Sequence, residues 1–259
     1  MDPVAESSAQ RKFDRGVGQV KTLLAEVEAY EAGRAIVFSS EIERLGPTEI
    51  LLRSFATERE SQPVHWPLLA GEAMQNLRAS LDHSIYAASG GKERTQFPIY
   101  KNAEDFAARP RSVLEGVPEA TVVAIERSQP YELAPENPTA EPLYLLRELS
   151  NADKHRVLAT VTAAVQHEAI GIGEGIAGHF EEFATGRPLG PGRRRISVYR
   201  ATRESEIAAE ELEPMFSYEV LLEGMRFSML KGIVDRVFQI LTEVETGEPL
   251  SPFVPYPLG

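Results

Sequence analysis

Two short polar clusters interrupt apolar, helix-like segments, and they hold the side chains of this chain with the most chemical potential. The first is Asn76-Leu77-Arg78-Ala79-Ser80-Leu81-Asp82-His83, and the second is Asn151-Ala152-Asp153-Lys154-His155-Arg156. Each contains an arginine, an aspartate and a histidine, which are costly to bury unless they pair with one another or serve a reaction. We therefore expect the clusters to meet in the fold, either as a substrate-binding site or as a network of polar contacts.

The spacing within the first cluster separates its ionisable groups. On a helix with about 3.6 residues per turn, Arg78 and Asp82 lie four positions apart and can pair. His83 falls on nearly the opposite face, close to Asn76. A regular helix therefore does not direct Arg78 and His83 into one pocket of a single subunit. Either the two meet across a dimer interface, or Arg78–Asp82 is a structural ion pair and His83 a core or interface residue.

In the second cluster, Arg147, Asn151 and His155 recur at intervals of four and can line one face of a helix. Lys154 and Arg156 also suit a helix C-terminus, whose partial negative charge attracts cations. That attraction does not explain why Asn151 and Asp153 stand between two apolar segments. The residues that we therefore assign to the network, or to substrate contacts, are Asn76, Asp82, Asn151, Asp153, Lys154, His155 and Arg156.

Composition removes several kinds of chemistry. The 259 residues carry a net charge of −12, so an RNA partner would need a local basic groove. There is no cysteine, which excludes disulfides and thiolate ligands. The histidines lack a close metal-ligand spacing, and residues 171–175 lack the Lys-Ser/Thr of a nucleotide loop. We expect no metal and no cofactor, and a turn at 171–175.

Neither a membrane-spanning segment nor a secretory signal is evident, so we expect a cytoplasmic protein without a membrane partner.

The apolar spacing predicts helices at residues 13–32, 67–88, 118–127 and 227–244, and another from 142 into the second cluster. Strands are predicted at 35–38 and 49–55, which flank Gly46-Pro47 as a hairpin, and at 196–199 and 216–222. Residues 157–165 fit a strand or a helix continuation.

These elements predict an α+β fold. It would have a helical core with long central helices, a β-hairpin near the N-terminus and a small antiparallel sheet from the C-terminal half. Residues 1–10 are expected to be disordered, 11–250 to form a single domain, and 251–259 to form a peripheral proline-rich tail.

With these motifs the chain resembles a group of uncharacterised bacterial and phage proteins that share Asn-Leu-Arg-x-x-Leu-Asp-His and a later Asn-x-Asp-Lys-His-Arg. Residues 76–83 and 151–156 match the two patterns, and Phe97-Pro98-Ile99 and Gln129-Pro130-Tyr131 between them are similar too. The similarity covers roughly residues 69–161 and implies no activity.

Arg78-Ala79-Ser80-Leu81-Asp82-His83 also resembles the signature of the HEPN superfamily, an arginine followed by a histidine after four to six residues. This resemblance implies a helical bundle and a metal-independent ribonuclease at a dimer interface. Arg78 would steady the scissile phosphate, and His83 would assist proton transfer. The chain departs from the pattern at Ala79, where a polar residue is common, and in the strands that follow Arg156.

Two functions are therefore expected from the sequence. One is a HEPN-like ribonuclease of a phage-defence or toxin type, with RNA as substrate, a homodimer as the active form, and Arg78 and His83 as catalytic residues. The other is a non-catalytic accessory or partner-binding protein with a buried Arg/Asp/His network. The sequence leaves open whether the protein is an enzyme.

Overall fold

The computed structural model describes residues 7–155, 161–183, 188–189, 192–247 and 255–258. The chain divides into two compact units. The helical unit takes Met1–Ala25, Val64–Ala159 and Phe227–Gly259, and the strand unit takes Glu26–Pro63 and Thr160–Arg226. The predicted α+β class is confirmed, with long helices, an N-terminal hairpin and antiparallel strands from the C-terminal half. That residues 11–250 behave as one domain stays a prediction.

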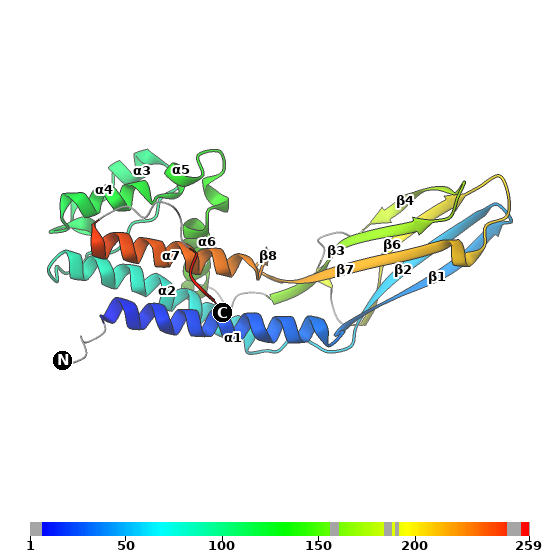
Figure 1. The fold of residues 1–259 in the computed structure, drawn as a ribbon, viewed down its shortest axis with the longest axis horizontal. Coiled ribbons are helices and arrows are strands. Elements are labelled where there is room, and N and C mark those ends of the chain that lie inside the picture. Colours follow the sequence, from blue (N-terminus) through cyan, green and yellow to red (C-terminus); the bar gives the residue numbers. More distant parts are fainter. Residues whose placement is uncertain (1–6, 156–160, 184–187, 190–191, 248–254, 259) are drawn as a thin grey trace. The chain divides into compact units, whose positions relative to one another are not determined.

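The helices surround one apolar core. They are α1 (Ser8–Ala32, the last turns of which belong to the strand unit), α2 (Trp66–Ala88), α3 (Ala103–Ala107), α4 (Glu119–Arg127), α5 (Pro130–Leu133), α6 (Pro142–His155) and α7 (Met229–Thr246), with 3-10 turns η1 (Arg111–Leu114) and η2 (Pro138–Ala140). Figure 1 shows α2 beside α7, and both helices also pack against α6. The fully buried side chains include Phe13, Leu77, Leu146 and Ile233, one from each of the long helices. Each long helix thus presents an apolar face to the core, and burial of these faces holds the helices together.

Local signals set the helix ends. Ser7 Oγ accepts a hydrogen bond from the Gln10 N–H at 3.1 Å, as an N-cap does. The first helix therefore begins at Ser8, and residues 8–10 are its first turn; their assignment to a disordered segment is corrected. At the C-terminal end of α7, Gly247 adopts a left-handed conformation with φ 72° and donates to the Glu243 carbonyl.

The described part of the C-terminal tail contacts the helical unit. The Tyr256 ring packs edge-on against Phe13 and Phe238, with centroid distances of 5.3 and 5.0 Å. The Tyr256 N–H also donates to Asp235 Oδ1 at 2.8 Å. The predicted peripheral segment is thus attached to the bundle at this residue.

The strand unit contains two antiparallel sheets. The first has the order β1 (Ile36–Gly46), β2 (Glu49–Glu58), β6 (Gly192–Thr202), β4 (Ala177–Phe183). The second has the order β5 (Pro188–Leu189), β3 (Val161–Ile172), β7 (Leu212–Leu222), β8 (Met225–Arg226), and η3 (Ala209–Glu211) precedes β7. The hairpin is present as predicted, and β2 extends it by pairing with β6.

The two sheets face each other across a shared core. Phe38 of β1 stacks on Phe216 of β7 with ring centroids 4.7 Å apart. Ile36 and Ile196 of the first sheet pack with Val165 of the second. The open choice at 157–165 is settled for residues 161–165, which are strand, while 156–160 lie outside the described residues. Among the helices described, none has the length and apolar composition that a membrane crossing requires.

Candidate functional site

The Arg78–Asp82 pair lies on the flank of α2. Met74, Leu77 and Leu81 are buried against the neighbouring helices, so the next positions around the helix lie at the edge of the core. Arg78 Nη2 donates to Asp82 Oδ1 at 3.0 Å, and the two side chains are 14% and 32% exposed. The predicted i, i+4 pair therefore forms, in a largely buried position.

The pair also binds the backbone of a single residue. The Phe97 N–H donates to Asp82 Oδ1 at 2.9 Å, and Arg78 Nη2 donates to the Phe97 carbonyl. Phe97 is fully buried in an extended segment that belongs to no sheet, so its polar backbone groups need side-chain partners. Arg78 and Asp82 together supply both.

Two further side chains hold the same extended segment. Gln129, which is fully buried, donates to the Pro98 carbonyl and accepts from the Tyr100 N–H, each at 2.9 Å. Arg147 Nη1 of α6 donates to the Ile99 carbonyl at 3.1 Å. Residues 97–100 are thus fixed by hydrogen bonds from three separate parts of the helical unit.

These contacts frame a polar cavity of about 250 Å³, which we call the arginine pocket. It is lined by Arg78, Asp82, Gln96, Phe97, Pro98, Ile99, Tyr100, Arg147, Ser150 and Asn151. Arg78 and Asp82 of the first cluster and Asn151 of the second therefore line one cavity. Alongside, Gln75 Nε2 donates to the Ser150 carbonyl at 2.6 Å and joins α2 to α6.

Electrostatics in the pocket favour negative charge. Burial lowers the pKa of the Arg78 guanidinium, the Asp82 carboxylate opposes this, and the charge of Arg147 lowers it further. The two guanidiniums are thus close enough to repel each other. Arg147 was not among the predicted site residues, although its spacing of four from Asn151 placed both on one face of the predicted helix.

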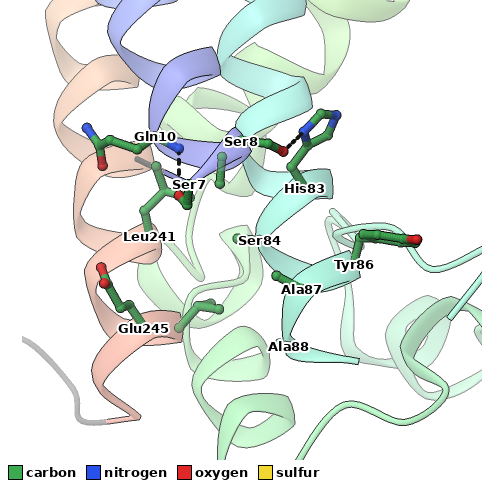
Figure 2. A pocket seen from close by; sticks show the side chains of 12 residues that line it. Ser7, Ser8, Gln10, His83, Ser84, Tyr86, Ala87, Ala88, Leu241 and Glu245 are labelled. Carbon is green, nitrogen blue, oxygen red and sulfur yellow. Dashed lines mark hydrogen bonds between the residues drawn. The ribbon is translucent and has the colours of Figure 1, made fainter. Parts of the chain in front are cut away.

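Asn76 and His83 lie on the side of α2 that faces α1. The Asn76 amide donates to Gln19 Oε1 at 2.9 Å, and its oxygen accepts from Lys12 Nζ at 3.3 Å. His83 Nδ1 lies 2.5 Å from Ser8 Oγ, in the first turn of α1. Figure 2 shows this contact at the rim of a second cavity of about 520 Å³, which we call the terminal pocket.

The terminal pocket is largely apolar. Ala9, Ala87, Ala88, Leu241 and Val244 line it together with His83 and other residues of the same helix ends. Arg78 does not line this cavity, and His83 does not line the arginine pocket. The predicted catalytic pair is therefore divided between two cavities within the protomer, as the helical spacing indicated.

The rest of the second cluster is less fully described. The backbone of Asp153, Lys154 and His155 forms the last turn of α6, but their side chains and all of Arg156 lie outside the described residues. Their assignment to the network or to substrate contacts stays a prediction.

Neither metal-ligand geometry nor similarity to known proteins assigns a chemistry to the described residues. Within the described ranges, no group of three or more histidine, aspartate or glutamate side chains could hold a metal ion. No protein-family model, no curated protein and no solved structure matches the chain. The resemblances in its motifs therefore stay predictions, and its function has to be argued from the chemistry of the two cavities.

Proposed function

We propose that the protein is a non-catalytic binding protein whose Arg78–Asp82 network is structural and whose arginine pocket receives a ligand. One observation carries the proposal: polar side chains from both clusters converge on a cavity whose walls are already fixed by hydrogen bonds. A preformed concave site with a few convergent polar groups is typical of small-ligand binding. The conformational entropy lost on binding is smaller when such groups are held in place before the ligand arrives.

The lining residues support binding rather than reaction. Asp82 Oδ1 already accepts from Arg78 and from the Phe97 N–H, so this carboxylate is engaged in structure. Ser150 Oγ donates to the Arg147 carbonyl at 3.1 Å and has no histidine beside it among the described residues. A ribonuclease of the HEPN type, with RNA as substrate, would need a second copy of the chain to bring His83 to Arg78.

A ligand screen tests the proposal directly. Wild-type protein is heated with neutral, cationic and anionic metabolites, and we expect a subset to raise the melting temperature. The substitution Asn151→Trp should abolish this effect by filling the pocket. Lys21→Trp, at an exposed position of α1, should leave it unchanged. Stabilisation that persists in Asn151→Trp would place the ligand elsewhere and refute the proposal.

An assay of RNA cleavage tests the alternative function, a ribonuclease. Purified protein is incubated with mixed RNA in EDTA, and we expect no cleavage. Cleavage that survives chelation, is lost in His83→Ala and persists in the exposed control His179→Ala would establish the ribonuclease instead.

A further inference from the structure

The arginine pocket contains more hydrogen-bond donors than the protein uses. Arg78 makes both of its hydrogen bonds through Nη2, so among the described residues Nε and Nη1 have no acceptor. Arg147 uses Nη1 for the Ile99 carbonyl, and its Nε lies 3.8 Å from Glu148 Oε1, beyond hydrogen-bond range. A guanidinium carries five N–H donors in a planar fork, so each of the two retains donors for a ligand.

Asn151, a polar residue that lines the pocket, adds a further donor. The Asn151 side chain is exposed at the edge of the pocket and has no hydrogen-bond partner among the described residues. Its amide can donate to a ligand oxygen. The backbone carbonyls that line the cavity at Phe97, Pro98 and Ile99 are occupied, because each already accepts a hydrogen bond from a side chain of the protein.

The charges of the lining side chains leave one positive charge unbalanced. Arg78 and Arg147 each contribute one positive charge, and Asp82 is the acidic residue among the lining side chains. Glu148 forms an ion pair with Arg147 at 3.8 Å, but its side chain is 53% exposed, where solvent weakens the attraction, and it does not line the cavity. A pocket with this balance suits a monoanion, whereas a phosphate dianion would leave excess negative charge in a partly buried site.

We propose that the arginine pocket binds the carboxylate of a small organic acid, whose oxygens accept hydrogen bonds from Arg78 and Arg147 and from the Asn151 amide. This inference rests on the proposed function and names its ligand class. The planar guanidinium fork matches a carboxylate, and charge-assisted hydrogen bonds of this kind are the stronger ones in proteins. The cavity of about 250 Å³ limits the ligand to a small molecule.

A titration with simple acids tests the ligand class. Sodium acetate and sodium benzoate are added at constant ionic strength, and the side-chain N–H resonances of arginine and asparagine are followed by NMR. We expect saturable shifts of the Arg78, Arg147 and Asn151 signals. Inorganic phosphate should bind more weakly than acetate. The absence of saturation, or tighter binding of phosphate, would overturn the proposed ligand.

Single substitutions test whether the carboxylate binds in the arginine pocket. Arg147→Ala should weaken carboxylate binding at least about tenfold, because it removes a charge-assisted contact. Arg15→Ala removes one positive charge from an exposed position on α1 and should bind as the wild type does. Asn151→Ala, also exposed, should weaken binding while leaving folding intact, so the conclusion does not depend on Arg147 alone. Equal affinities of Arg147→Ala and Arg15→Ala would refute the site.

The two proposals fail in different ways. If the metabolite screen yields neutral or cationic ligands that Asn151→Trp excludes, the binding function holds and the carboxylate inference is wrong. If cleavage of RNA in EDTA depends on His83, the binding function itself is wrong.

Discussion

At the scale of single residues, Arg78 has a structural role that its motif does not reveal. It satisfies the Phe97 carbonyl and pairs with Asp82, which in turn accepts from the Phe97 N–H. Removing the arginine leaves a partly buried carboxylate without its counter-charge and a buried carbonyl without its donor. We expect Arg78→Ala to lower the free energy of unfolding by about 2–4 kcal/mol, measured by urea denaturation.

We compare the stability cost of Arg78→Ala with that of a substitution at His83. This histidine is partly exposed, and its hydrogen bond is to Ser8 in the first turn of α1. We expect His83→Ala to cost less than about 1 kcal/mol by the same measurement, because water can replace that contact. A larger loss for His83→Ala than for Arg78→Ala would show that the histidine, rather than the arginine, holds the network together.

The same residues show how far the sequence informs the site. Helical spacing was enough to predict that Arg78 pairs with Asp82 and that His83 faces another way. The Phe97 backbone could not be identified as their partner, because that contact spans 15 residues or more and depends on the path of an irregular segment. Gln129 belonged to a motif on which a predicted resemblance rests, but its role could not be predicted, since its amide matters only because residues 98 and 100 pass beside it.

At the scale of elements, the correct predictions rested on local sequence patterns. Gly46-Pro47 predicted the hairpin turn, and periodic apolar residues predicted the long helices. β4 was missed because nearly all its side chains are exposed, so it lacks the alternation that identifies a half-buried strand. The pairing of β2 with β6 joins residues far apart in the sequence and depends on tertiary packing rather than on local pattern.

The packing of α1 on α2 gives a prediction for one glycine. A Cβ added at Gly16 would lie 2.9 Å from Leu77 Cγ and 3.2 Å from the Ala73 carbonyl oxygen. We expect Gly16→Ala to destabilise the protein by about 1–3 kcal/mol, because the two helices must separate or Leu77 must leave its rotamer. Thermal or urea unfolding measures the change.

Gly18, in the same helix, is the matched control. A Cβ there meets nothing within 4 Å, so alanine gains helix propensity without a clash. We expect Gly18→Ala to stabilise the protein by about 0.5–1 kcal/mol. Equal effects at the two positions would mean that α1 and α2 do not pack closely at Gly16.

At the scale of the whole molecule, neither unit is continuous in the sequence. The helical unit combines three segments and the strand unit two. Composition and periodicity assign an element its type, but they do not say which distant segment completes its core. This is why the class was predicted from the sequence while the sandwich of two sheets was not.

Each unit also contains a tyrosine that should make stability fall at alkaline pH. Burial, followed by the charge of Glu58, raises the pKa of Tyr30 in the strand unit to about 12. Burial, followed by the charge of Glu126, raises the pKa of Tyr131 in the helical unit to about 12. The unfolded chain ionises these phenols near pH 10. Their contribution to stability is therefore complete below pH 10 and is lost as the pH rises to about 12.

Substitution by phenylalanine separates this alkaline effect from hydrogen bonding. Tyr30 donates to the Glu60 carbonyl at 2.7 Å, so Tyr30→Phe should cost about 1 kcal/mol at neutral pH. The Tyr131 hydroxyl is buried without a hydrogen-bond partner among the described residues, so Tyr131→Phe should be neutral or stabilising there. Both variants should lose less stability than the wild type between pH 10 and 12, measured by urea unfolding at each pH. An unchanged alkaline slope in both would mean that the two phenols ionise in the folded protein as readily as in the unfolded chain.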